Sequence, residues 1–282
     1  MIGFEVMFLI VLGLVWLVFA SIEDIRTKEV ADWLNFSLII FILGFRFFYS
    51  LFELESFMFF YQGLVWFGIF FVLAHLFYYS RMFGGGDAKL MYAFGPLIAF
   101  SESFSVNWKI AASFILIFFL VGAVYGLIGT VILMFRNFKR FKKQFAKQFK
   151  KFNKLALVVM VLALILMGFG FSLMREFFYL GVLLFIMPLL FIFSKAIAEA
   201  EMVKSILVGK LREGDLLYAD VKVGKSVVKM SWEGLEKDEI EKIRRYHKKV
   251  KIREGLAYVP VFLISFLVLI YFFNSELWNS FF

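Results

Sequence analysis

The chain has 282 residues, 62% of them hydrophobic, and its mean hydropathy of +0.86 excludes an ordinary soluble globular protein. Cysteine is absent, which excludes disulfides, thiolate metal sites and cysteine nucleophiles, and the two histidines, His75 and His247, are too far apart in sequence for a zinc-protease pair. The net charge of +9 indicates cytoplasmic loops and contact with anionic lipid rather than nucleic acid.

Long apolar runs dominate the chain from its first residues. About 20 apolar residues cross the hydrocarbon core of a bilayer. On this measure, spans are predicted near residues 3–21, 34–52, 57–79, 88–101, 110–135, 155–171, 177–194 and 257–273. The span 88–101 is short and interrupted by Gly95-Pro96, which predicts a kinked or re-entrant outer end. The predicted fold class is an all-α polytopic membrane protein with about eight transmembrane helices and a small cytoplasmic α+β domain.

The order of these runs divides the chain into five predicted segments. They are a membrane domain (1–135), a basic amphipathic interfacial helix (136–154), a transmembrane hairpin (155–194), a small cytoplasmic domain (195–256) and a C-terminal transmembrane helix (257–282). In the second segment phenylalanines recur every three or four residues with lysines between them, which predicts a helix with Phe toward lipid and Lys toward water.

The cytoplasmic segment has a soluble pattern. The alternating residues Tyr218–Val223, the turn residue Gly224 and the pair Val227-Val228 predict a β-hairpin. Residues 235–250 follow with an amphipathic pattern, which predicts a helix that leads directly into the last span.

The distribution of Lys and Arg predicts the orientation in the membrane. Nine basic residues and no acidic one lie in 136–154, and fifteen more basic residues lie in 195–257. Both segments are therefore expected in the cytoplasm, and counting spans backwards places the loops 22–33 and 80–87 there too. The N-terminus and the C-terminus are then both expected outside.

Two aspartates lie at this cytoplasmic face, Asp24 at the end of the first span and Asp87 at the start of the fourth. An ionisable group at a membrane position is a functional-site hypothesis. Two carboxylates held close together share a proton, so that one can activate a water molecule while the other polarises a carbonyl. Taken alone, Asp24 also fits an interfacial charge paired with Arg26 or Lys28, and Asp87 fits a helix N-cap.

Helix dipoles suggest different roles for the two carboxylates. Asp87 opens a predicted helix, where the dipole favours a carboxylate, whereas Asp24 ends one, where the dipole disfavours it. This pattern predicts that the shared proton resides more often on Asp24 and that Asp87 is the base.

Further residues surround the two aspartates in sequence. Gly84 to Gly86 lack a Cβ, so they permit close backbone approach and unusual backbone angles. Asp32 is expected to be the N-cap of the second span, and Lys89 to reach lipid headgroups or pair with another loop. His75 is expected to form hydrogen bonds within the helix bundle, with contact to the aspartates as the alternative.

These motifs carry a family resemblance. Asp24-x-Arg26-x-x-x-Val30 after a first span, followed by Gly84-x-Gly86-Asp87-x-Lys89-Leu90 opening a later one, resembles the prepilin peptidase family of GxGD aspartyl proteases. Residues Leu211 to Asp215 and 234–240, with the last apolar span, resemble the C-terminal region of archaeal preflagellin and prepilin peptidases. The resemblance covers residues 1–135 and roughly 205–273. The chain lacks the Cys-rich methyltransferase insert of many bacterial members, which favours the archaeal branch.

The resemblance implies a membrane-embedded aspartyl endopeptidase that removes a short basic leader from preflagellin or type IV prepilin-like precursors at the cytoplasmic face. It maps the catalytic pair onto Asp24 and Asp87, with no metal or cofactor, and makes the membrane-inserted precursors and the lipid bilayer the expected partners. Three residues are expected to support the motif: Gly84, Gly86 and Lys89. Candidates for leader binding or for a supporting contact are Glu23, Arg26, Glu29, Asp32 and His75.

Three other functions fit parts of this pattern. A presenilin-like intramembrane protease shares the Gly-x-Gly-Asp motif, but its first aspartate lies deeper in a span than Asp24. A transporter that uses the aspartates as ion ligands would need further polar residues in mid-membrane, where the spans offer little beyond Arg46, Gln62 and His75. A structural membrane partner in a secretion machine is the non-enzymatic alternative.

Overall fold

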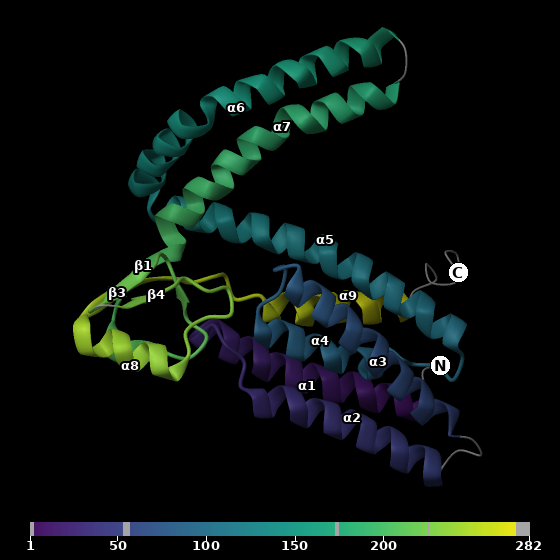
Figure 1. Ribbon diagram of the computed structural model, residues 1–282. Helices are drawn as coiled ribbons and strands as arrows, with labels where there is room; N and C mark the ends of the chain where they lie inside the picture. Colours follow the sequence, from purple (N-terminus) through teal and green to yellow (C-terminus); the bar gives the residue numbers. More distant parts are fainter. Residues whose placement is uncertain (1–2, 53–56, 173–174, 225, 275–282) are drawn as a thin grey trace. The chain divides into compact units, whose positions relative to one another are not determined.

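The computed structural model describes residues 3–52, 57–172, 175–224 and 226–274. The chain forms two compact units (Figure 1). Unit 1 contains Met1–Gly126 and Leu256–Phe282, and unit 2 contains Leu127–Gly255. Unit 2 is therefore an insertion in unit 1. Residues 1–2, 53–56, 173–174 and 275–282, which belong to predicted segments, lie outside the described residues.

Unit 1 is helical throughout its described part. Its helices are α1 (Phe4–Thr27), α2 (Asp32–Phe52), α3 (Met58–Tyr79), α4 (Gly85–Ile98), the first two-thirds of α5 (Phe104–Arg136), and α9 (Val259–Asn274). Each predicted span in this part of the chain falls on one of these helices, which confirms the predicted fold class for unit 1.

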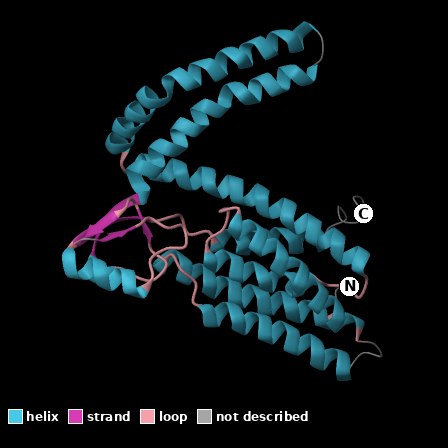
Figure 2. Cartoon of the chain, viewed as in Figure 1, coloured by secondary structure: helices cyan, strands magenta, loops and turns pink. Residues whose placement is uncertain are grey.

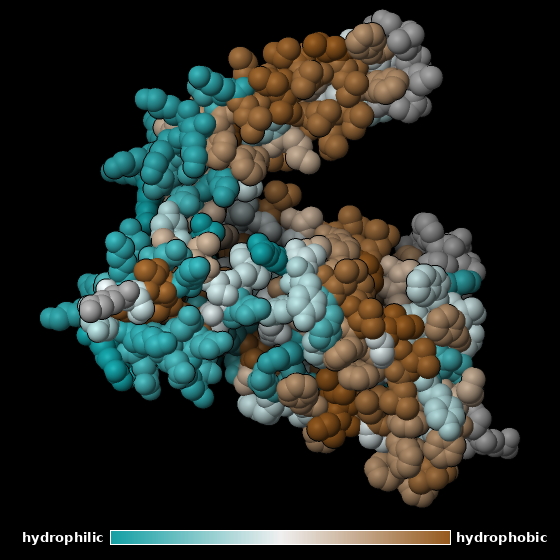
Figure 3. Space-filling model, viewed as in Figure 1, coloured by the Kyte–Doolittle hydropathy of each residue, from teal (hydrophilic) through white to brown (hydrophobic). Residues whose placement is uncertain are grey.

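The helices are long and apolar enough for a membrane protein. Among the described residues, six helices meet the length and hydropathy of a membrane span: α1, α2, α3, α5, α6 and α7. With 14 and 16 residues, α4 and α9 extend only about 21 and 24 Å, less than the roughly 30 Å of a hydrocarbon core. Apolar side chains cover much of the outer surface of unit 1 (Figure 3), as at Val72, which is 68% exposed. Together with the long apolar helices, such a surface is typical of a protein that lies in a membrane.

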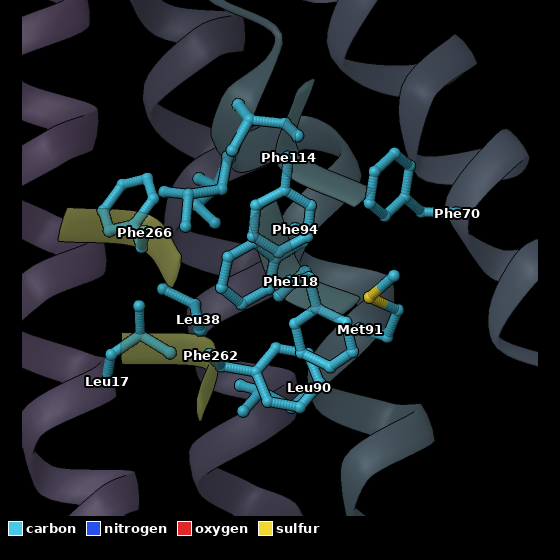
Figure 4. Close-up of a cluster of buried hydrophobic side chains, with 14 of the residues drawn as sticks. Leu17, Leu38, Phe70, Leu90, Met91, Phe94, Phe114, Phe118, Phe262 and Phe266 are labelled. Atoms are coloured by element: carbon cyan, nitrogen blue, oxygen red, sulfur yellow. The ribbon is translucent and has the colours of Figure 1, made fainter. Parts of the chain in front are cut away.

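The core of unit 1 is aromatic and aliphatic (Figure 4). Phe94 of α4 lies at its centre, with its ring 4.6 Å from Phe114 of α5 and 5.2 Å from Phe262 of α9. Leu17 of α1 and Leu38 of α2 line the same cluster. The short helix α4 is thus enclosed by α1, α2, α3, α5 and α9, so its first turn has a defined position.

A close backbone approach fixes α4 against α3. At Gly95, a Cβ atom would overlap the carbonyl group of Trp66, with the carbonyl carbon only 2.6 Å away and Phe67 N at 3.0 Å. Only glycine permits this approach. Gly95 therefore determines how closely α4 packs on α3.

A fully buried arginine donates hydrogen bonds to carbonyl groups at the C-terminal end of α4. Arg46 of α2 has no exposed surface and donates hydrogen bonds to the carbonyl oxygens of Pro96 (2.9 Å), Ala99 (2.5 Å) and Phe59 (2.7 Å). The last carbonyls of a helix lack intrahelical donors, and a cation there also interacts favourably with the dipole. Arg46 is therefore a structural partner of α4 and α3. Its hydrogen bonds give a structural reason for one of the polar residues considered for an ion pathway, which are Arg46, Gln62 and His75.

Unit 2 begins with a long helical hairpin. Helix α6 (Phe138–Ser172) is followed by α7 (Arg175–Ile197) and a π-helical turn, η1 (Ala198–Met202), and α6 packs along α7. The basic residues 136–154 and the apolar run that follows them belong to this one helix from Phe138 onward, and α6 is about 50 Å long. Phe141 is buried, with its ring 5.5 Å from Phe193 of α7. Part of the recurring row of phenylalanines in residues 136–154 thus packs on protein rather than on lipid.

The remainder of unit 2 holds the strands (Figure 2). A three-stranded antiparallel sheet has the order β1-β5-β2, and β3 pairs with β4 as the predicted hairpin. The strands are β1 (Val203–Leu207), β2 (Leu216–Leu217), β3 (Val221–Val223), β4 (Ser226–Val228) and β5 (Lys249–Arg253), with a 3-10 turn η2 (Val208–Lys210) and helix α8 (Lys237–Tyr246). This is the predicted small α+β region.

The prediction of one helix over residues 235–250 is wrong at its C-terminal end. Helix α8 ends at Tyr246, and β5 follows from Lys249 with Val250 and Ile252 buried on one face. Pairing with β1 and β2 stabilises this alternation as a strand. A strand and a loop therefore separate α8 from α9.

Candidate active site

Two short connections bring the predicted aspartates to one end of unit 1. Residues 28–31 join α1 to α2 and residues 80–84 join α3 to α4, so the end of α1 and the start of α4 share a side of the bundle. Asp24 lies in the last turn of α1 and Asp87 is the third residue of α4. The two helices contact each other.

Asp24 is held by a helix from the other end of the chain. Its side chain is buried, with 5% exposed, and its Oδ2 accepts the backbone N–H of Val259, in the first turn of α9, at 2.9 Å. The alternative prediction, an interfacial charge paired with Arg26 or Lys28, does not describe it, since neither forms an ion pair with it and Lys28 acts only through its charge. The Asp24 carboxylate is therefore held by a backbone N–H donor rather than by a cationic side chain.

Asp87 is half-buried and closes the first turn of its own helix. Its Oδ2 accepts the N–H of Gly84, the N-cap residue, at 3.4 Å. Asp87 is thus at N3 rather than at the N-cap position. The charges of Asp87 and Asp24 interact. Two carboxyl groups in this relation can share a proton and act as general acid and general base.

The structure adds a second helix end to the predicted division of roles. Asp24 ends α1, but it also lies at the N-terminus of α9, where the dipole and the N–H of Val259 favour a carboxylate. Both aspartates therefore lie at a positive helix end, and the bond to Asp24 is the shorter. Helix dipoles do not single out Asp87 as the base.

The glycine run has ordinary backbone angles. None of Gly84, Gly85 and Gly86 has a positive φ, and α4 begins at Gly85, so the unusual backbone angles that these glycines permit are not used. A Cβ at Gly86 would meet only Val30 N, at 3.9 Å, and one at Gly85 would meet nothing within 4 Å. The protein itself therefore leaves room for a methyl group at both positions.

Lys89 and Asp32 form an ion pair. Lys89 Nζ lies 2.5 Å from Asp32 Oδ1, and the two side chains are 35% and 60% exposed. Asp32 is the first residue of α2 rather than its N-cap. This bridge links the start of α4 to the start of α2, and exposed pairs of this kind contribute at most about 1 kcal/mol.

The other acidic candidates have structural partners. Glu23 Oε2 accepts the N–H of Ala31 at 3.3 Å, and the carbonyl oxygen of Glu29 accepts the hydroxyl of Thr27 at 2.8 Å, so both belong to the bonded turn between α1 and α2. Glu23 and Arg26 border a groove of about 490 Å³ between α1 and α2. The groove is mostly apolar and Asp24 and Asp87 do not line it. Its lining residues are Val15, Trp16, Phe19, Ile22, Glu23, Arg26, Thr27, Trp33 and Leu34.

His75 belongs to an aromatic cluster on the helix bundle. Its Nδ1 lies 2.9 Å from the carbonyl oxygen of Phe71, and its ring stacks on Tyr92 at 5.5 Å. This is the expected hydrogen bond within the bundle. No contact joins His75 to either aspartate among the described residues.

Three residues near the aspartates were not among the sequence candidates. Tyr125 of α5 interacts with the charge of Asp24, and Tyr258, before α9, with that of Asp87. Ser21, one turn before Asp24, is buried, and its Oγ has no hydrogen-bond partner among the described residues. The tyrosines come from distant parts of the sequence and no local pattern marks them. Ser21 shares a helix face with Asp24 at the i, i+3 spacing, which is the one signal available beforehand.

The comparisons identify the part of the chain that holds this site. Residues 11–128 match the type IV leader peptidase family, a range that includes Asp24, Asp87 and Tyr125 but ends within α5. Neither a curated protein nor a solved structure matches the chain. The apolar helices support a multi-pass membrane protein, and the match indicates similarity to a peptidase over residues 11–128. The part of the chain that holds Asp24 and Asp87 is therefore similar to the type IV leader peptidase family.

Proposed function

We propose that this protein is an aspartyl endopeptidase that removes the short basic leader of archaeal preflagellin and type IV prepilin-like precursors. The observation that carries the proposal is the pair Asp24 and Asp87, whose charges interact within the region that matches the leader peptidase family. One carboxylate takes a proton from the attacking water, and the other, protonated, donates a hydrogen bond to the scissile carbonyl. No other group is needed for this chemistry.

The proposed site faces the cytoplasm, with both termini on the opposite side. Support comes from the two strongly basic segments, 136–154 and 195–257, which the positive-inside rule assigns to the cytoplasm. The aspartates share their end of the bundle with Arg26, Lys28 and Arg81, in keeping with this orientation. A precursor held in the membrane by its apolar helix would present its leader at this level.

The basic leader would bind near acidic side chains at the mouth of the site. The side chain of Asp32 is 60% exposed and its present partner is Lys89. A leader lysine would therefore exchange with Lys89 rather than meet a free carboxylate. Glu23 and Glu29 belong to the adjoining turn. Such a contact is weakened by salt, because exposed charges are screened.

Cleavage of tagged precursors tests the function. Membranes containing the protein are incubated with C-terminally tagged preflagellin and prepilin-like precursors, and the product masses locate the cut. We expect a cut between the leader and the apolar helix, and at least about tenfold slower cleavage when leader lysines are changed to glutamine, since one tenfold step is about 1.4 kcal/mol. A cut inside the apolar helix would support the presenilin-like alternative. Absence of any cut would contradict the proposal and favour a non-enzymatic role.

The glycine run provides a prediction that separates substrate clearance from folding. We expect Gly86→Ala to lower the cleavage rate at least about tenfold, because the substrate backbone must pass beside the first turn of α4. The added methyl fits the protein itself, with Val30 N at 3.9 Å, so the unfolding temperature should stay near that of the native protein. Cleavage rates and thermal unfolding in detergent measure the two effects.

Gly85→Ala is the matched control for this prediction. It adds the same methyl group one residue earlier, where nothing lies within 4 Å, and it should cleave faster than Gly86→Ala. Equal rates for both variants and the native protein would mean that the run does not face the substrate.

A further inference from the structure

The chain re-joins unit 1 beside the proposed catalytic pair. Unit 2 is inserted between Gly126 and Leu256, so Tyr125 and Ala257 flank its two connections. The hydroxyl of Tyr125 donates a hydrogen bond to the carbonyl oxygen of Ala257 at 2.8 Å. This bond fixes residue 257 against α5, two residues before the N–H that reaches Asp24.

The next two residues, Tyr258 and Val259, contact α5 and α1 respectively. The Tyr258 side chain lies against Gly122 of α5, where a Cβ would be 3.3 Å from the ring carbon that carries the hydroxyl, and its ring is 5.8 Å from Phe118. Val259 is 1% exposed, and its N–H donates to Asp24. The segment 257–259 is therefore bonded to α5 at one end and to α1 at the other.

The hydrogen bond to Asp24 Oδ2 comes from the backbone amide of Val259, and the backbone N–H of Tyr258 also acts on this carboxyl group. Residue 260 is proline and has no N–H, so the first turn of α9 offers one donor fewer than an ordinary helix. Both partners are buried, and a hydrogen bond to an ionised group in such surroundings is stronger and more directional than one in water. It holds Oδ2 of Asp24, and so limits the directions in which the other carboxyl oxygen can point.

We infer that the first turn of α9 positions Asp24 for catalysis through the N–H of Val259, and that Tyr125 keeps this turn in place through Ala257. The inference rests on the proposed function, because it assigns a positioning role at that site. It extends the active site to residues beyond 11–128, the range that matches the family. The C-terminal helix is then required for chemistry as well as for packing.

Proline substitution removes the donor while the helix start is retained. Proline is well tolerated at the first position of a helix, which Val259 occupies, so Val259→Pro deletes the N–H without breaking α9. Val259→Ala loses side-chain volume but retains the N–H. The ratio between the two variants therefore isolates the hydrogen bond.

We expect Val259→Pro to have a kcat at least about tenfold below that of Val259→Ala, with a similar KM, because the chemical step and not substrate binding loses its orientation. The acidic limb of its pH–rate profile should move to higher pH. The lost N–H stabilised the carboxylate form of Asp24, so a proton binds more readily without it. Tyr125→Phe, which deletes only the hydroxyl, should shift kcat and the acidic limb in the same directions by a smaller factor.

A readout without substrate separates this inference from the proposed function. Infrared difference spectra of the purified protein with ¹³C-labelled aspartate, compared with those of Asp24→Asn, follow protonation of the Asp24 carboxyl group. A shifted titration in Val259→Pro would support the contact even if no precursor were cleaved, which would overturn only the function. If the native protein cleaves precursors while Val259→Pro and Tyr125→Phe match Val259→Ala in kcat, pH profile and spectrum, the inference is overturned and the function stands. Tyr125→Phe also provides the test if Val259→Pro does not fold.

Discussion

Asp24→Asn and Asp87→Asn are each expected to lower precursor cleavage by at least about 10³-fold, equivalent to about 4 kcal/mol of barrier. An amide cannot accept the proton of the attacking water, nor can it share a proton with the remaining carboxylate. Both substitutions retain an oxygen that can accept the N–H of Val259 or of Gly84, so the bonds that fix each side chain are preserved. The loss therefore reports chemistry, and cleavage assays at matched expression measure it.

Two comparisons make this result decisive. The double variant should be no slower than the slower single variant, because residues that act as one unit are not additive. Asp32→Asn serves as the comparison for a proposed leader contact outside the dyad, and because this aspartate forms an exposed ion pair with Lys89, its loss should cost less than tenfold. Full cleavage by either catalytic variant would remove the dyad from the mechanism.

Gly95→Ala is expected to destabilise unit 1 more than any other single methyl addition considered above. The new Cβ would overlap the carbonyl group of Trp66, whose carbon lies 2.6 Å from its position, and both belong to helix backbone that cannot rotate away. Overpacking of a rigid core costs roughly 1–3 kcal/mol, and a backbone overlap lies at or above the upper end of that range. The start of α4 moves with the helix, so cleavage should fall together with the unfolding temperature.

Gly68→Ala is the matched control on α3. The same methyl group there meets nothing within 4 Å, and alanine is the better helix former, so stability should be unchanged or slightly higher. Thermal unfolding in detergent and cleavage rate are measured for both variants. A Gly95→Ala protein as stable as the Gly68→Ala protein would show that α3 and α4 separate at little cost.

The joint loss expected for Gly95→Ala differs from the result expected for Gly86→Ala. In the first case α4 is displaced, and folding and activity fall together. In the second the helix remains in place, with Val30 N at 3.9 Å from the new methyl, and only the substrate is obstructed. The two glycines of one helix thus separate a packing role from a substrate-facing one.

Apolar length and charge distribution in the sequence were enough to predict the helices of unit 1. Long runs of residues such as those in α1 and α3 can satisfy their backbone groups in lipid only as helices, so each predicted span became one. The hairpin β3–β4 was also predictable, because Gly224 with a positive φ supplies its turn. Residues 249 and 250 were misassigned to a helix because the alternation of β5 is short and becomes a strand only by pairing with β1 and β2.

The sequence by itself determined the membrane class, the helical spans and the two aspartates, because these depend on composition, on local periodicity and on a short motif. Only the tertiary structure decided how Asp24 is held. Val259 lies 235 residues away in sequence, and the contact exists because α9 packs against α1 after unit 2 has been inserted. The role of Arg46 was likewise undetermined, since its carbonyl partners lie on α3, on α4 and at Ala99, directly after α4. A hydrogen bond to a distant backbone amide leaves no pattern in the sequence, because every residue except proline carries the same N–H.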